Sequence, residues 1–239
     1  AAFASERTLY TRARVDGFGF DGRFESWSAR PDRHYSRTTL GPFSLAEGSD
    51  GATAWRTDPT TSKIVPLHDN DLLDAKVSTW FELERWAEPD QGGGDVALEG
   101  SERDSLGAYT VLRVASPYSG VKPRKLWFDD RTGFLMRVVS PRDAQSVITE
   151  LSDWRAAFGR TRAFTSLTRV AEMPMNRLTA VTDSIAINPS VEGLPFRPPT
   201  EVPAAGLQWL KQVGVAQLPL EYHSRHLWLK VSPDGGPSE

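Results

Sequence analysis

The feature that most constrains the fold is a long series of short segments in which apolar and polar residues alternate. Residues 12–28 show the pattern first: Phe18, Phe20 and Phe24 fall on one parity, and Asp21, Arg23 and Glu25 fall on the other. Such alternation is typical of a β-strand that buries one of its faces. Three glycines in this segment predict bulges or sharp curvature, and they are Gly17, Gly19 and Gly22.

Short strands of the same kind follow along most of the chain. They are predicted at residues 33–40, 43–47, 53–57, 63–67, 96–102, 108–115, 124–129, 134–139, 147–153, 161–170 and 177–187. Gly, Pro and Asp turns separate them, and the turn at 129–133 is typical of a hairpin because Gly133 can supply a positive φ. Since such short connections join antiparallel neighbours, the strands are expected to form one antiparallel sheet.

One segment breaks the strand pattern. In residues 69–87 the apolar residues recur at helical spacing, and they are Leu73, Val77, Trp80, Phe81 and Trp86. Asp69 or Asn70 can cap the N-terminus of a helix here, and Pro89 with the glycines that follow it ends the helix. The wide aromatic stripe predicts that this helix packs strongly against the sheet.

These elements predict a mainly β protein. A large curved antiparallel sheet, in effect an incomplete β-barrel, is expected to wrap around the one long helix and to have an apolar concave face. After Asn188, five prolines fall within fifteen residues, which is typical of an extended linker. We therefore expect a half-barrel domain at residues 1–197, a Pro-rich linker at 198–214 and a C-terminal β-hairpin within 215–239.

The composition excludes several classes of function. A net charge of −3, with basic and acidic residues interspersed, argues against a nucleic-acid partner, whose binding surface would be basic. The absence of cysteine removes disulfides, thiol nucleophiles and cysteine-ligated zinc. No apolar run approaches the roughly 18 residues of a transmembrane segment. No cofactor is expected, since the glycines at 92–94 lack the Lys and Ser/Thr of a phosphate-binding loop.

The sequence assigns no catalytic residue and no metal site. His223 and His226 form an H-x-x-H, but ordinary turn histidines are the favoured interpretation. Ser, His and Asp residues are abundant, yet no G-x-S-x-G elbow is present. The question of enzymatic activity therefore stays open for this chain.

Three pieces of the chain resemble the lipoprotein-carrier fold of the bacterial LolA/LolB type. They are SDGATAW at 49–55, FDDRTGFL at 128–135, and LSDWR at 151–155 followed by Phe158-Gly159 and Phe164. The last piece resembles the family's "sDyR…dG…P" strand pair, although Trp154 replaces the usual Tyr and no Pro follows directly after Phe164. The resemblance covers residues 8–190 and implies an exported protein with a lipid or acyl chain as its ligand.

The C-terminal residues are similar to the first hairpin of bacterial retropepsin-like aspartic proteases. The similar pieces are LPLE at 218–221, HLWLKV at 226–231 and DGGP at 234–237. In that family the hairpin leads into a strand that ends in Asp-Thr-Gly and carries the catalytic aspartate. Neither Asp-Thr-Gly nor Asp-Ser-Gly occurs in this chain. The resemblance therefore implies an aspartic protease whose catalytic segment is missing here or lies on a separate chain.

An apolar cavity between the sheet and the helix is the candidate binding site. Its expected lining residues are Phe20, Trp55, Val77, Trp80, Phe81 and Trp127. Such a cavity would take a lipid or an acyl chain, because an incomplete barrel with one helix leaves part of its concave face unfilled. A packed aromatic core is the alternative interpretation of the same residues.

The main functional hypothesis is a non-catalytic, N-terminal accessory part of an exported bacterial aspartic endopeptidase, which binds substrate or lipid or holds the enzyme inactive. Its partner would be a catalytic half or domain that follows Glu239. The alternative is a free-standing periplasmic carrier of lipids or lipoproteins. A third hypothesis is an interaction module of the cell envelope. A periplasmic or otherwise exported location is expected, and Ala1 could be a mature N-terminus after removal of a signal peptide.

Overall fold

The computed structural model of this chain describes residues 5–59, 61–142, 145–199, 220–223 and 226–229. The chain divides into two compact units, Ala1–Ala204 and Ala205–Glu239. The first unit contains the large sheet and the helix. Apart from residues 198 and 199, the predicted linker at 198–214 lies outside the described residues, so its boundaries stay a prediction.

Thirteen strands of the first unit form one antiparallel sheet with the order β6-β5-β4-β3-β2-β1-β13-β12-β11-β10-β9-β8-β7. One half consists of β1 (Thr8–Gly17), β2 (Phe20–Ala29), β3 (Arg33–Leu40), β4 (Phe43–Ser49), β5 (Ala54–Thr57) and β6 (Ile64–Pro66). The other half consists of β7 (Asp95–Arg103), β8 (Ala108–Ala115), β9 (Arg124–Asp129), β10 (Leu135–Arg142), β11 (Gln145–Ala157), β12 (Arg160–Val170) and β13 (Met173–Ile187). The predicted mainly β fold class is confirmed, and the sheet is open, with β6 and β7 at its edges.

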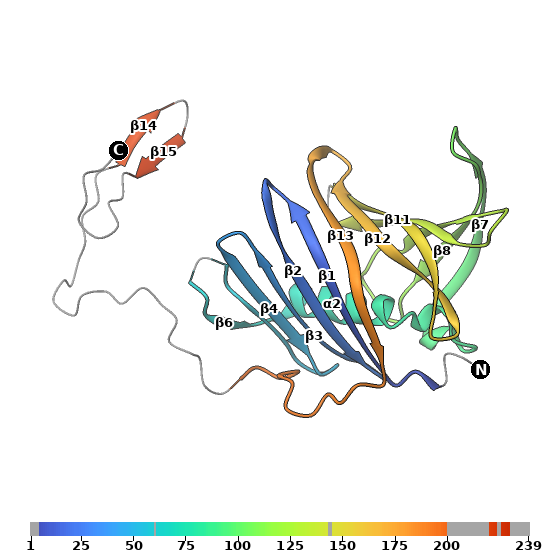
Figure 1. The fold of residues 1–239 in the computed structure, drawn as a ribbon, viewed down its shortest axis with the longest axis horizontal. Coiled ribbons are helices and arrows are strands. Elements are labelled where there is room, and N and C mark those ends of the chain that lie inside the picture. Colours follow the sequence, from blue (N-terminus) through green and yellow to red (C-terminus); the bar gives the residue numbers. More distant parts are fainter. Residues whose placement is uncertain (1–4, 60, 143–144, 200–219, 224–225, 230–239) are drawn as a thin grey trace. The chain divides into compact units, whose positions relative to one another are not determined.

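The path of the chain explains the order of the strands. From β1 to β6, each strand is added beside the previous one, toward one edge of the sheet. Helix α2 (Asp69–Glu82) then crosses to the other edge, and β7 to β13 return until β13 pairs with β1. Figure 1 shows α2 running between the two halves of the curved sheet. A helix of 14 residues is about 21 Å long, so it bridges the inner face without covering all of it.

The segment predicted as one bent strand at 12–28 is a hairpin of two strands. β1 ends at Gly17 and β2 begins at Phe20, and the two residues between them have positive φ angles, 55° at Phe18 and 81° at Gly19. Two consecutive residues with positive φ are typical of the two-residue turn that matches the twist of a hairpin. The alternation correctly indicates strands here, but Gly19 marks a turn and not a bulge.

Helix α2 is shorter than the predicted span of 69–87. It ends at Glu82, and Glu84 turns left-handed with a φ of 51°. A contact with the sheet replaces the next helical hydrogen bond, because the carbonyl oxygen of Leu83 accepts from Arg30 Nη2 at 2.9 Å. Two short 3-10 helices follow, η1 (Arg85–Ala87) and η2 (Gln91–Gly93).

Cross-strand partners lie on the same face of a sheet, so the register assigns each side chain to a face. The inner face is the one that contacts α2, and His34 of β3 reaches the helix from it. Thr38 of the same strand has the same parity, and it lies opposite Phe24 of β2 and Leu45 of β4. These side chains therefore share the inner face with His34.

The main core lies between α2 and the part of the sheet formed by β8 and β9. Trp80 of α2 is 1% exposed and packs with Val114 and Leu126. Its indole Nε1 donates to the carbonyl oxygen of Gly92 at 3.0 Å. The large buried ring with a satisfied N–H fixes the helix against the β7–β13 half of the sheet.

The second unit contains a small hairpin. β14 (Leu220–His223) and β15 (His226–Leu229) pair as antiparallel strands, with His223 opposite His226. The predicted C-terminal hairpin is therefore confirmed at these residues, while the rest of 215–239 lies outside the described part of the chain. Within the described residues, no helix has the length and apolar character needed to cross a lipid bilayer.

Candidate functional site

The inner face of the sheet carries a large hollow that we call the apolar groove. It has a volume of 470 Å³, and its lining, from strands β2 to β6 and the β5–β6 turn, includes Phe24, Leu45, Pro59 and Val65. No residue of α2 lines it, so the helix leaves it open. Leu45 and Val65 are 37% and 40% exposed although both are apolar.

Two further hollows continue the apolar groove along the inner face. A central hollow of 240 Å³ shares Phe24 with the groove and adds Leu151 and Phe164. An aromatic hollow of 400 Å³ shares Leu151 with the central hollow and reaches Trp86 and Trp154. The charged side chains of Glu84, Arg160 and Arg162 also line it. Neighbouring hollows share lining residues, so the three adjoin one another along the inner face, and we call them together the trough.

A fourth hollow, the polar pocket, lies between α2 and strands β3 to β5. It has a volume of 340 Å³ and shares Glu47 and Arg56 with the apolar groove. Its other charged lining residues are His34, Asp71, Asp74 and Glu82. Four carboxyl groups thus accompany two basic side chains, so the polar pocket carries net negative charge beside a mainly apolar groove.

One ion pair joins α2 to the sheet inside the polar pocket. His34 is 6% exposed, and its Nδ1 lies 2.9 Å from a carboxylate oxygen of Glu82. Burial disfavours the charged imidazole, but the charge of Glu82 outweighs burial, so the pKa of His34 is raised. Burial also opposes the charge of the carboxylate, but His34 outweighs it, so the pKa of Glu82 is lowered. Both groups are therefore charged at mildly acidic pH.

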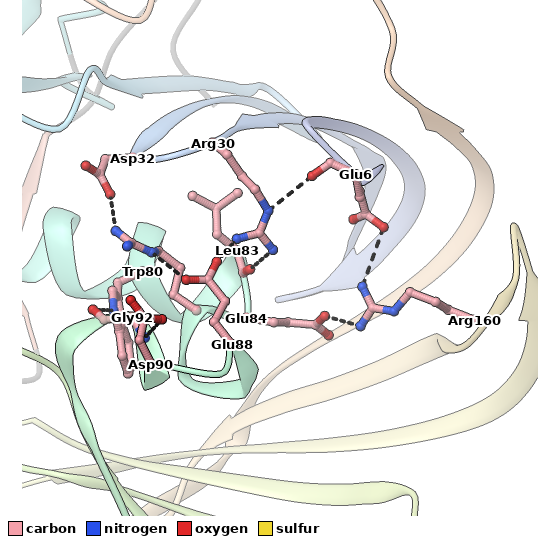
Figure 2. A network of polar contacts seen from close by, with 11 residues as sticks. Glu6, Arg30, Asp32, Trp80, Leu83, Glu84, Glu88, Asp90, Gly92 and Arg160 are labelled. Carbon is pink, nitrogen blue, oxygen red and sulfur yellow. Dashed lines mark hydrogen bonds and ion pairs between the residues drawn. The ribbon is translucent and has the colours of Figure 1, made fainter. Parts of the chain in front are cut away.

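A network of polar contacts fastens the segment after α2 to the sheet, as Figure 2 shows. Arg30, in the β2–β3 connection, donates to the carboxylate of Glu88 and to the carbonyl oxygen of Leu83. Two more pairs of the network are Arg85 with Asp32, at 2.8 Å, and Arg160 with Glu84. These contacts fix the position of the helix end over the inner face, and two of the residues, Glu84 and Arg160, also line the aromatic hollow.

The structure brings together three of the six residues predicted to line an apolar cavity. Val77 and Trp80 are 3% and 1% exposed, and the ring of Phe81 packs edge-on against Trp80 at 4.9 Å. Arg124 lies over the Phe81 ring at 4.0 Å from its centroid. These three residues belong to the packed core under α2, and none of them lines the four hollows described above.

Phe20 and Trp127, predicted for the same cavity, lie on opposite faces of the sheet. Phe20 is on the inner face beside the β1–β2 turn, where it is 39% exposed and its ring lies 6.0 Å from Phe43. Trp127 follows Leu126, which packs under the helix, so its own side chain is on the outer face. There its Nε1 donates to Glu102 at 2.8 Å. These two residues therefore do not share one cavity.

Trp55, the sixth predicted residue, belongs to an aromatic ladder on the outer face. Its ring centroid lies 6.2 Å from that of Tyr35, which in turn lies 5.5 Å from that of Trp27. Trp55 borders the polar pocket, but its Nε1 donates to the carbonyl oxygen of Pro195 at 3.0 Å. A ligand contact by any of the six predicted residues stays a prediction.

Sequence reasoning missed the residues that line the trough, such as Leu45, Val65 and Phe164. Alternation divides the side chains of one strand between two faces of the sheet. It does not tell which of these two sets lies on the same face as a given set of the neighbouring strand, because that depends on the register. Among the lining residues, Phe24 belongs to the alternating segment at 12–28, so the sequence indicates that its side chain lies on an apolar face.

The chemistry that this arrangement offers is binding of an amphiphilic molecule. The mainly apolar groove adjoins the charged polar pocket, so one ligand could place an apolar chain in the groove and a polar group in the pocket. Across the residues that the structure describes, no group of three or more His, Cys, Asp or Glu side chains is arranged to hold a metal ion.

No protein-family model and no curated protein matches the sequence. Several solved structures match the fold. A DUF1329 family protein from Desulfovibrio piger has a TM-score of 0.54 at 12% identity, over 82% of this chain and 91% of that chain. A LolA superfamily protein from Nitrosomonas europaea has a TM-score of 0.52 at 11% identity, over 78% and 88%. A domain from Vibrio parahaemolyticus, described as an outer membrane lipoprotein-sorting protein, has a TM-score of 0.50 at 10% identity, over 80% and 89%.

These similarities show that the chain has a LolA-like fold. Because the identities are low, they establish the fold alone. The resemblance to lipoprotein carriers, expected from the sequence, is thus confirmed at the level of the fold. None of these three structures points to a retropepsin-like protease, so the protease context receives no support from them.

Proposed function

We propose that this chain is a lipid or lipoprotein carrier that binds an acyl chain in the trough of its inner face. The observation that carries the proposal is the trough, whose three adjoining hollows measure 470, 240 and 400 Å³. Leu45 and Val65 line it and remain more than a third exposed. Apolar side chains gathered in a concave surface gain free energy when an apolar ligand covers them.

Hydrophobic transfer gives the expected scale of binding. Each buried CH₂ group contributes about 0.8 kcal/mol, so eight such groups contribute about 6 kcal/mol. This free energy corresponds to a dissociation constant on the order of 10 to 100 μM, before the cost of association is counted. Affinity is therefore expected to rise with chain length and to be weak for chains of a few carbons.

A periplasmic or otherwise exported location is part of the proposal. It is supported by the fold that this chain shares with a domain described as lipoprotein-sorting. Fractionation of cells that make the protein natively, followed by detection with a specific antibody, tests the location. Recovery of the protein in the cytoplasmic fraction would contradict this part of the proposal.

The binding proposal is tested by displacement of a fluorescent fatty acid from the wild-type chain and from Leu45→Glu. Leu45 is 37% exposed in the apolar groove, so a glutamate there leaves the fold intact but places a charge against the acyl chain. We expect the variant to bind at least tenfold more weakly.

The matched control is Leu106→Glu. Leu106 is 82% exposed in the β7–β8 turn and lines none of the hollows of the trough, so its substitution should leave the affinity unchanged. Failure of the wild-type chain to bind acyl chains of any length, or equal loss in both variants, would count against the proposal.

A second candidate function is the accessory part of an exported aspartic endopeptidase. The observation in its favour is the antiparallel pairing of β14 with β15, because a hairpin at this place is what the resemblance to retropepsin-like proteases implies. The test is the reading frame after Glu239 in the natural gene. A strand ending in Asp-Thr-Gly within about a dozen codons would support this function, whereas a stop codon directly after Glu239 would exclude it.

A further inference from the structure

The polar pocket opens beside the apolar groove, and the two share Glu47 and Arg56. A ligand whose chain lies in the groove therefore has its polar end at these two side chains. The volume of the polar pocket, 340 Å³, falls at the lower end of the range of about 300 to 1,000 Å³ that is typical of small-molecule sites. The pocket is therefore large enough for a compact head group.

Two carboxylates of the polar pocket form no ion pair with a described residue. Asp74 makes no ion pair or hydrogen bond with any described residue, and Glu47 accepts a hydrogen bond from the Ser36 hydroxyl at 3.2 Å. The other two carboxylates are already paired, Asp71 with Arg56 at 3.1 Å and Glu82 with His34 at 2.9 Å. The unmatched charge is therefore negative, and it favours an ammonium group with several N–H donors.

The same pocket also offers donors. His34 is buried to more than nine-tenths, and its Nδ1 is occupied by Glu82 and by the Ser28 hydroxyl at 3.4 Å. Its Nε2 has no hydrogen-bond partner among the described residues. A buried imidazole that has one nitrogen free donates readily to an anionic oxygen when the ring is charged. Arg56, half exposed at the mouth of the pocket, supplies further N–H groups.

We propose that the polar pocket binds the head group of the lipid, and that this head carries an ammonium group beside a phosphate, as phosphoethanolamine does. The proposal rests on the proposed function, since the acyl chain would lie in the apolar groove. Asp74 and Glu47 accept from the ammonium group, while His34 and Arg56 donate to the phosphate. A head group with a phosphate and no amine, such as phosphoglycerol, gives Asp74 and Glu47 no cation to bind. It also brings a negative charge into a pocket that is already negative.

The test compares two lysophospholipids that have the same single acyl chain and differ in the head, one with phosphoethanolamine and one with phosphoglycerol. Binding to the full chain is measured by titration calorimetry. We expect the phosphoethanolamine lipid to bind at least tenfold more tightly. In Asp74→Asn this preference should fall to threefold or less, because the substitution removes the carboxylate and keeps the shape.

The matched control is Asp16→Asn, which removes the same charge from an exposed position on the outer face of β1. This variant should keep the full preference for the phosphoethanolamine lipid. That result would distinguish an effect of the pocket from the general attraction of an acidic protein for an ammonium group. Equal affinity for the two lipids, with tighter binding of longer chains retained, would overturn the head-group inference and leave the acyl-chain proposal standing. Absence of binding for both lipids at any chain length would overturn both, and equal loss of preference in the two variants would overturn the role of the pocket.

Discussion

At the scale of the residue, His34 shows how burial and charge compete. The imidazole is almost completely buried between the inner face and α2, which by itself favours its neutral form. The carboxylates of Glu82 and, more weakly, Glu47 act in the opposite direction, and the net result is a raised pKa. Arg124 further favours the charged form of Glu82. The pair therefore links the attachment of the helix to pH.

We expect the free energy of unfolding to fall as the pH rises through the pKa of folded His34. That pKa lies above the ordinary value of 6.5, so the contribution of His34 is complete below pH 6.5 and is lost at higher pH. Glu82 acts at the other end, since its lowered pKa makes a contribution that is complete above 4.5 and is lost as the pH falls through its folded value.

Urea denaturation at pH 5.5, 7 and 8.5 measures this effect. His34→Gln should have a flatter dependence between pH 5.5 and 8.5 than the wild-type chain, whatever its absolute stability. Parallel curves for the two proteins would show that the imidazole of His34 does not carry the effect.

At the scale of the element, the buried stripe of α2 follows from its own sequence pattern. The position of its C-terminal end depends on a contact with the sheet. The helical spacing of apolar residues reflects a real stripe, because Val77 and Trp80 are buried. The end of the helix, in contrast, depends on Arg30, whose side chain binds the carbonyl oxygen of Leu83. Since Arg30 lies more than fifty residues before the helix end, local pattern could not predict that the helix stops at Glu82.

Substitution of Trp80 tests the anchoring of α2. Trp80→Ala removes a ring that is 1% exposed and leaves a cavity between α2 and strands β8 and β9, so we expect a loss of about 3–5 kcal/mol in the free energy of unfolding. Phe20→Ala is the comparison, because Phe20 is 39% exposed and its loss should cost about 1 kcal/mol or less. Chemical denaturation measures both, and a similar loss in the two variants would contradict the assignment of Trp80 to the core.

At the scale of the whole first unit, the crossing of α2 from edge to edge decides where a ligand can bind. One half of the sheet precedes the helix in sequence and the other half follows it, so the helix lies across the inner face by necessity. It fills that face over β8 and β9, borders the polar pocket over β3 to β5, and leaves the apolar groove uncovered. The unfilled part is the apolar groove with its exposed Leu45 and Val65.

Binding at the trough should stabilise the folded state, because a ligand that binds only the native protein shifts the unfolding equilibrium. At a free concentration 100 times the dissociation constant, a long-chain fatty acid is expected to add about 2.7 kcal/mol. For a chain of this size the midpoint of thermal unfolding should rise by about 5–10 °C. Differential scanning calorimetry should show the full rise for wild type and Leu106→Glu. At the same ligand concentration Leu45→Glu should show about half that rise or less, because a tenfold weaker affinity leaves about 1.4 kcal/mol of stabilisation. A rise of equal size in all three would place the ligand outside the groove.

Much of the fold could be predicted from the sequence, and little of the site. The strands, helix α2 and the curved antiparallel sheet follow from local periodicity. Of the six residues predicted for the cavity, Trp80 lies in the packed core and Trp127 on the outer face. An aromatic residue has the same local pattern in a core, in a groove or on an outer ladder. Its environment is set by residues that are distant in sequence.

The sequence by itself therefore determined the kind and the order of the elements. The spacing of apolar residues in each segment indicates which face of that element is buried, and this spacing differs between strands and helices. The tertiary structure alone decided which face of each strand meets α2, since a shift of one residue in register moves every side chain to the other face. It also decided that Phe24, Leu45 and Val65 line one groove, and that His34 and Asp74 lie beside it in one pocket. These residues come from different elements, and only the pairing of the strands and the path of α2 bring them together.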